Sequence, residues 1–160
     1  MRRWGAAVAL TLLAATPAGV ARAEPVAPQP GSPCAAEQTG ALTWVPDDRV
    51  PLECNGVWQE STAAYPVSDR WLSYGPALKL YGEGRRVASV ASGSWTGTPT
   101  NPASRCRAEQ YAVVYGTPTV GPPLVSEGAV GQPLAVTIVP LLFTVSFSGE
   151  CLWVKDAGNR

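Results

Sequence analysis

The chain has 160 residues, with 12 basic and 12 acidic side chains, four cysteines and no histidine. This balance of charge gives no electrostatic reason to bind a nucleic acid, whose phosphates require a basic footprint, so nucleic-acid binding is not expected. The absence of histidine excludes Ser–His and Cys–His nucleophilic catalysis and removes the commonest metal ligand.

Residues 1–23 have the three parts of a secretory signal peptide. Arg2 and Arg3 give a basic start, an uncharged apolar run covers 5–15, and Ala21 and Ala23 satisfy the small-x-small rule for cleavage. The alternative is a membrane anchor, but the apolar run is about half the roughly 20 residues that span a bilayer. The polar residue that precedes a twin-arginine pair is missing. We therefore expect cleavage after Ala23, export by the general secretory route, and no stable membrane span afterwards.

Cleavage would leave residues 24–160, with nine basic and twelve acidic side chains. This mildly acidic chain has no electrostatic reason to bind anionic lipids or nucleic acid. Residues 24–33 hold four prolines, which predicts an extended, disordered arm. Residues 34–157 remain, enough for a single β domain with one hydrophobic core.

The four cysteines lie in the part of the chain that would be exported. An even number of cysteines in a small secreted domain indicates disulfides, and four allow three connectivities. Of these we favour Cys34–Cys54 with Cys106–Cys151. A zinc site is the alternative, but no two cysteines lie within a C-x₂₋₄-C spacing and histidine is absent. No metal or cofactor is expected.

Beyond Cys34, glycine, proline, asparagine or aspartate recurs about every eight to twelve residues, and short runs rich in valine, leucine, tyrosine, tryptophan and threonine lie between. This rhythm predicts an all-β fold: a small disulfide-containing β-sandwich, for which an immunoglobulin-like arrangement is one form. No helical apolar period persists, so any helix would be a single turn near 33–38. The expected strands cover 41–45, 56–59, 70–74, 77–81, 87–95, 107–115, 134–139, 141–147 and 151–155.

One stretch predicts a corner. Apolar positions are even-numbered over 134–138 and odd-numbered over 143–147. A straight strand cannot change its inward parity, because its side chains alternate strictly between two faces. Pro140 also lacks the N–H that a central strand requires. We therefore expect a bulge or corner near 139–141, where one strand ends or crosses between sheets.

The tryptophans that follow the leader allow two interpretations. Each lies in or beside an expected strand, and tryptophan is a large core residue whose N–H needs a partner, so most should be buried or half-buried. The functional alternative is a stacking platform for sugar rings, which requires at least two exposed aromatics on one face. The five residues are Trp44, Trp58, Trp71, Trp95 and Trp153.

Motifs for nucleophilic and nucleotide chemistry are absent from the sequence. Residues 93–97 (GSWTG) differ from a nucleophile elbow, because Ser94 directly follows the first glycine and no histidine can activate it. Neither lysine has a serine three residues before it, and no glycine motif for phosphates or dinucleotides is present. We therefore expect no enzymatic activity.

Paired carboxylates need no sequence motif, so a small glycan hydrolase is an alternative. It would need two carboxyl groups about 5 to 10 Å apart in a cleft. The acidic residues lie next to turn or polar residues, as surface charges do. The basic pair Arg85 and Arg86, beside Glu83 in an expected turn, is likewise interpreted as solvated. The candidate acids are Asp47, Asp48, Glu53, Glu60, Asp69, Glu109 and Glu150.

Several features together resemble a group of exported proteins. They are the Arg-Arg start, the leader ending in Ala-Arg-Ala, the proline-rich arm, the four-cysteine domain, and the stretches 41–51 (ALTWVPDDRVP) and 68–76 (SDRWLSYGP). A composition rich in Ala, Gly, Pro and Val with only two lysines indicates a GC-rich genome. In these respects the chain is similar to uncharacterised small exported proteins of mycobacteria and related actinobacteria. Some of those are immunoglobulin-like sandwiches, so the resemblance favours that fold and implies no functional residue.

The favoured interpretation is a secreted or cell-envelope, non-enzymatic β domain that acts as a binding or structural module. Its partner would be an unidentified protein or glycan of the envelope or of the space beyond it. One alternative is the glycan hydrolase described above. The other is a secreted proteinase inhibitor that presents a rigid loop over 46–54, next to a disulfide.

Overall fold

The computed structural model describes residues 26–45, 50–116 and 119–158. The expected leader, with Ala21 and Ala23, lies outside these ranges, as do Asp47 and Asp48. No helix within them is long and apolar enough to cross a bilayer. The elements are η1, a 3₁₀ turn (Ala36–Gln38), and the strands β1 (Leu42–Thr43), β2 (Leu52–Asn55), β3 (Val57–Glu60), β4 (Arg70–Tyr81), β5 (Gly93–Pro99), β6 (Arg107–Ala112), β7 (Leu124–Glu127), β8 (Leu134–Ile138) and β9 (Leu142–Lys155).

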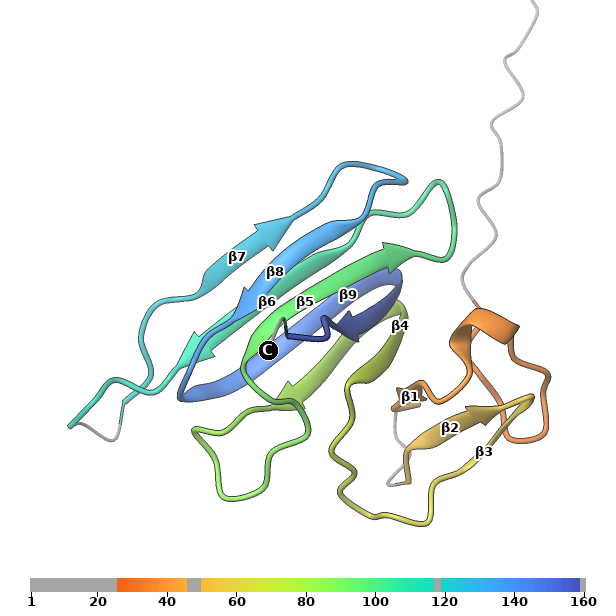
Figure 1. Cartoon of the computed structure of the whole chain (residues 1–160), viewed down its shortest axis with the longest axis horizontal. Coiled ribbons are helices and arrows are strands. Elements are labelled where there is room, and N and C mark those ends of the chain that lie inside the picture. The colour runs from red at the N-terminus through yellow and green to blue at the C-terminus, as the bar shows by residue number, and fades with distance from the viewer. Residues whose placement is uncertain (1–25, 46–49, 117–118, 159–160) are drawn as a thin grey trace, which may run out of the picture.

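All nine strands belong to one mixed sheet. The order is β3-β2-β1-β4-β9-β5-β8, with β6 paired to β9 and β7 paired to β6. β1 runs parallel to β4, and the other pairs are antiparallel. Strands β1 to β3 lie at one end of the molecule and β7 and β8 at the other, with β4 and β9 between them (Figure 1). The predicted all-β fold is confirmed. The finer prediction of an immunoglobulin-like sandwich is not confirmed, since hydrogen bonds join every strand into one sheet.

Strand β9 is shared between two parts of this sheet. β4 pairs with one edge of β9 along nearly its whole length. On the other edge, β6 pairs with the first half of β9 and β5 with the second half. The partner of β9 changes from β6 to β5 near Gly149 (φ +89°). This glycine lies opposite Gly75 (φ +129°) on β4. Glycine adopts such angles readily because it has no Cβ.

The two halves of β9 curve toward each other. Phe147 and Trp153 stack with ring centroids 4.1 Å apart and ring planes 8° apart. Six residues of straight strand would separate their positions by about 20 Å. β9 must therefore bend between them, and β4 accompanies it through a bulge between Gly75 and Leu78.

The main core lies within this curve and is built around three tryptophans. Trp71, Trp95 and Trp153 are fully buried, together with Phe147. Their indole N–H groups all donate hydrogen bonds: Trp71 to the Ser68 carbonyl oxygen (3.1 Å), Trp95 to that of Ala91 (3.1 Å) and Trp153 to the Ser73 hydroxyl (3.0 Å). Trp58 is buried in a second, smaller core beside β2 and β3. The expectation that most tryptophans are core residues is confirmed.

A buried amide side chain links β6 to β8. Gln110 is 2% exposed. Its Nε2 donates to the Thr137 carbonyl oxygen (3.0 Å), and its Oε1 accepts from the Val139 N–H (3.1 Å). β8 takes its backbone partner from β5. Gln110 thus completes a circuit that runs from β9 through β5, β8 and β6 back to β9, around the main core.

The corner predicted near 139–141 is present. β8 ends at Ile138 and β9 begins at Leu142, and between them Leu141 has a φ of +57°, an uncommon value for a residue with a side chain. β8 lies beside β5, whereas the start of β9 lies between β4 and β6. The change of parity therefore marks a crossing between two parts of the sheet.

The proline-rich arm joins the sheet at its last residues. The Gly31 N–H donates to the Trp58 carbonyl oxygen (2.7 Å), and the Trp58 N–H donates to that of Ser32 (2.8 Å). Pro33 forms a bridge with Val57. We expected disorder over 24–33, and this is wrong for 31–33. The open edge of β3 presents unpaired peptide groups, and the arm satisfies them.

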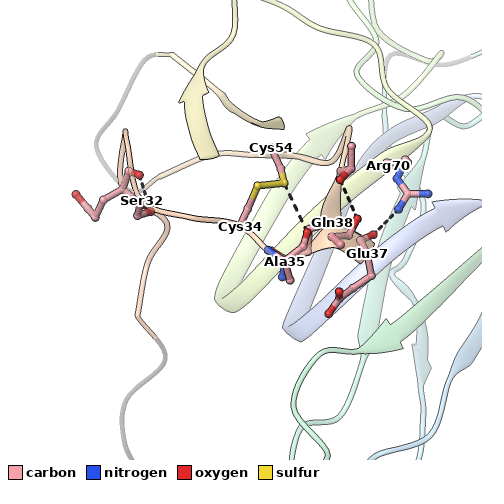
Figure 2. The surroundings of a disulfide bond; sticks show 10 residues. Ser32, Cys34, Ala35, Glu37, Gln38, Cys54 and Arg70 are labelled. Carbon is pink, nitrogen blue, oxygen red and sulfur yellow. Dashed lines mark hydrogen bonds between the residues drawn. A yellow bond between two sulfur atoms is a disulfide. The ribbon is translucent and has the colours of Figure 1, made fainter. Parts of the chain in front are cut away.

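Both favoured disulfides are formed. Cys34–Cys54 ties the arm to β2 with 6.0 Å between Cα atoms, and Cys106–Cys151 ties the start of β6 to β9 with 5.9 Å. Beside the first of these, Arg70 donates to the Glu37 carbonyl oxygen at 2.6 Å (Figure 2). Two disulfides in a small domain fit an oxidising environment.

Several strand predictions are wrong in their bounds. The runs 70–74 and 77–81 form the single strand β4, and the runs 141–147 and 151–155 form the single strand β9. The glycines between these runs bend the strands instead of ending them. The expected strand over 87–95 begins only at Gly93, and β2 and β7 were not expected.

Candidate binding pocket

A cavity of about 490 Å³, which we name the Trp44 pocket, lies against the second half of β4. Its walls come from the residue that follows β1, from the loop between β3 and β4, from β4, and from the loop between β4 and β5. The lining residues are Trp44, Tyr65, Lys79, Tyr81, Arg85, Arg86, Val87 and Ser89.

Alternation along β4 supplies two of the lining side chains. Leu78 and Leu80 are buried in the main core. Because successive side chains of a strand point to opposite faces, Lys79 and Tyr81 project to the outer face and into the pocket. Directly after the strand, Gly82 approaches Leu142 so closely that an added Cβ would lie 2.4 Å from the Leu142 Cβ. A glycine at this position lets the chain turn tightly toward the pocket.

Backbone hydrogen bonds hold both loops of the pocket in place. The Ser89 and Val90 N–H groups donate to the Tyr81 carbonyl oxygen (2.7 and 3.1 Å), which closes the loop after β4. The Ser68 N–H donates to the Ser89 carbonyl oxygen (3.1 Å) and so ties this loop to the one that carries Tyr65. These bonds fix the loop after β4 against the end of that strand and against Ser68.

Three aromatic side chains from separate segments meet at the pocket. Trp44 and Tyr81 are half-buried, and Tyr65 is 73% exposed. Trp44 also forms a wall of a second cavity of about 340 Å³, which Tyr74 lines as well. The Tyr74 hydroxyl donates to the Trp44 carbonyl oxygen (3.4 Å), and burial raises the pKa of Tyr74, so the hydroxyl keeps its proton. The pocket therefore combines one exposed tyrosine with two half-buried rings, whereas the alternative of a stacking platform requires at least two exposed aromatics.

The charged side chains of the pocket are all cationic. Lys79, Arg85 and Arg86 line it, and no acidic side chain of the described residues does so. The Arg85 guanidinium carbon lies 4.1 Å from the centroid of the Tyr81 ring, a cation–π contact. The neighbouring Glu83 carboxylate accepts from the Ser92 N–H (3.3 Å). Both arginines are exposed, as expected for a solvated pair, and both also line the pocket.

The acids considered for a hydrolase lie away from this pocket. Glu109 on β6 accepts hydrogen bonds from Arg107 (2.5 Å) and from the Tyr111 hydroxyl (2.8 Å), and these bonds lower the pKa of Glu109. The general acid of a glycan hydrolase requires a raised pKa, so the lowered pKa of Glu109 does not suit that role. Glu150 accepts from the Asn101 amide (3.1 Å). None of the described acids from Glu53 to Glu150 lines the Trp44 pocket, and the described residues contain no group of three or more side chains suited to a metal ion.

The segment expected to form an inhibitor loop is described only from residue 50 onward, since residues 46–49 lie outside the described ranges. Residues 52–54 belong to β2, which pairs with β1 on one side and β3 on the other, and Leu52 and Cys54 are buried. The prediction of a rigid loop over 46–54 is therefore wrong for residues 52–54. The Cys54 disulfide stabilises this strand from the side of the arm.

Sequence reasoning found Trp44 as a candidate and missed the rest of the pocket. Its residues lie in three segments, and their proximity depends on pairings between distant strands. One local signal was available, since Lys79, Tyr81, Arg85 and Arg86 follow one another within eight residues. No protein-family model, no curated protein and no solved structure matches the chain.

Proposed function

We propose that this chain is an exported, non-enzymatic binding module of the cell envelope or the space beyond it, and that it holds a glycan in the Trp44 pocket. The observation that carries the proposal is the meeting of Trp44, Tyr65 and Tyr81 at one cavity. The volume of about 490 Å³ is within the range of sites for small ligands, which span roughly 300 to 1,000 Å³.

The chemistry of the lining suits a sugar. The face of an aromatic ring carries negative charge density, which attracts the polarised C–H groups on one face of a sugar ring. The hydroxyl groups of a sugar need hydrogen-bond partners, and Ser89, Lys79 and the two tyrosine hydroxyls are available at the walls. Polar groups set among aromatic surfaces are typical of pockets that orient a ligand.

Two further features support the proposed location. The disulfides Cys34–Cys54 and Cys106–Cys151 fit an oxidising space. The sequence of residues 1–23 supplies the pattern of a secretory leader.

Tryptophan fluorescence tests the proposal directly. Cleavage of the leader removes Trp4. In the processed protein, Trp58, Trp71, Trp95 and Trp153 are at most 3% exposed, so iodide should quench mainly Trp44. The protein is expressed from its full sequence, recovered in oxidised form and titrated with polysaccharides extracted from the envelope. We expect a bound glycan to protect the quenchable emission, and the glycan to be recovered with unchanged chain length. New reducing ends in the recovered glycan would favour the hydrolase.

Two tyrosines provide a matched pair of variants. Tyr65→Ala removes an exposed ring inside the pocket, whereas Tyr115→Ala removes a 91% exposed ring outside it. We expect Tyr65→Ala to weaken binding by about tenfold, as loss of one stacked ring does, and Tyr115→Ala to leave it unchanged. Equal effects, or protection of Trp44 by no envelope polysaccharide, would refute the proposal.

A further inference from the structure

The basic residues of the domain are unevenly distributed. Residues 24–160 contain nine lysines and arginines and are acidic overall, yet three of the nine line the Trp44 pocket. Across β9 from Lys79, on β6 and next to it, Arg105 pairs with Glu127, and Arg107 pairs with Glu109 and Glu127. No ion pair within the described ranges includes Lys79, Arg85 or Arg86. The pocket therefore concentrates positive charge that carboxylates of the described residues leave uncompensated.

Arg85 is held in an orientation that suits an anion. Its guanidinium carbon lies 4.1 Å from the Tyr81 ring centroid and 5.2 Å from that of Phe143. Its backbone N–H donates to the Gly82 carbonyl oxygen (3.0 Å), which fixes the start of the side chain. A guanidinium stacked on rings keeps its N–H donors at its edge, where they can bind the two oxygens of a carboxylate together. Rings that orient a cation beside an open cavity reduce the entropy lost when an anion binds.

We infer that the ligand of the Trp44 pocket is an acidic saccharide, whose sugar ring stacks on Trp44 and Tyr65 and whose carboxylate is bound by Arg85 with Arg86 and Lys79. This inference rests on the proposed function and adds the charge of the ligand to it. Charge complementarity selects the anion, and the aromatic walls select a ring over a flexible acidic peptide.

The ligand test compares three probes on the full-sequence protein in oxidised form. The first is a panel of uronate polysaccharides: pectate, alginate and hyaluronan. The second is the same panel after reduction of the carboxyl groups, which retains the rings and removes the charge. The third is polyglutamate, which retains the carboxylates and lacks sugar rings. We expect at least one uronate to bind, its carboxyl-reduced form to bind at least tenfold more weakly, and polyglutamate not to compete.

Salt and substitutions give the second test. Binding of the uronate should weaken as sodium chloride is raised, since salt screens exposed charges. Arg85→Gln should weaken it by about tenfold or more, the usual effect of losing a hydrogen bond between charged groups. Arg105→Gln, which removes an equal charge outside the pocket, should leave binding unchanged. Intact disulfides and an unchanged unfolding midpoint in both variants confirm that they fold.

The outcomes separate this inference from the function on which it rests. If carboxyl-reduced glycans bind as tightly as uronates and Tyr65→Ala alone weakens binding, the pocket binds glycans but the inference is wrong. If polyglutamate competes equally, the site recognises charge without the ring and the inference is also wrong. If no glycan of either kind binds, both proposals are refuted.

Discussion

Substitution of Gly149 by alanine tests the bend in β9, on which the main core depends. Gly149 has a φ of +89°, and an added Cβ would lie 2.1 Å from the Arg105 carbonyl oxygen. The left-handed backbone costs a residue with a side chain about 1 kcal/mol or more. The contact adds about 1 to 3 kcal/mol, because the neighbouring backbone must move to relieve it. Movement there is resisted, since the next residue, Cys106, is bonded to Cys151.

We therefore expect Gly149→Ala to lower the free energy of unfolding by about 2 to 4 kcal/mol. The assay is urea unfolding followed by tryptophan fluorescence, which reports the buried indoles. Gly56→Ala is the matched control: Gly56 has a similar φ of +76°, but an added Cβ would meet no atom within 4 Å. This control should lose only about 1 kcal/mol. Equal losses in the two variants would refute the idea that close packing at the bend requires glycine.

Three further predictions follow from the core, the disulfides and the carboxylates. Ser73→Ala removes the acceptor of the buried Trp153 indole N–H and should cost about 1 to 3 kcal/mol in urea unfolding, and a neutral result would contradict this. Replacement of Cys106 and Cys151 by serine removes a crosslink between residues 45 apart and should destabilise the domain by about 4 kcal/mol. Replacement of Cys34 and Cys54, which are 20 residues apart, should cost about 3 kcal/mol. The reverse order in the same assay would refute this prediction. The pKa of Glu109 is lowered in the folded state, chiefly by the bond from Arg107, so its contribution to stability is complete above the ordinary value of 4.5 and is lost as the pH falls. Glu109→Gln should flatten the decline of Tm with pH below 4.5, and parallel curves would argue against it.

The sequence predicts the fold class well because strand signals are local. Runs of β-forming residues between turn residues identify an all-β domain, and a parity change around Pro140 locates a corner. The sequence predicts the two halves of β9 as separate strands because Gly149 lies between them. A glycine marks a sharp backbone change, but local sequence does not show whether hydrogen bonding continues beyond it.

The pocket was harder to predict, because its walls come from distant parts of the chain. Trp44 follows β1, Tyr65 lies in the next long loop, and Arg85 lies beyond β4. Their proximity requires β1 to pair in parallel with β4, and parallel pairing leaves no short-range signal. The role of Arg85 depends on the Phe143 and Tyr81 rings beneath it, which strand alternation alone does not bring together.

Gln110 has a consequence for how the domain meets other copies of itself. Its side-chain amide has an N–H donor and a carbonyl acceptor, as a peptide group does. These groups bond the Thr137 carbonyl oxygen and the Val139 N–H, with which an added strand would have to pair. The arm likewise bonds the free edge of β3, where Gly31 and Ser32 pair with the N–H and carbonyl groups of Trp58. Strand addition is thus blocked at Thr137 and Val139 by a side chain, and at Trp58 on β3 by a segment that precedes the first strand. Among the described strands, β7 has a ladder partner on one side only, β6, so its other edge leaves peptide groups without a strand partner.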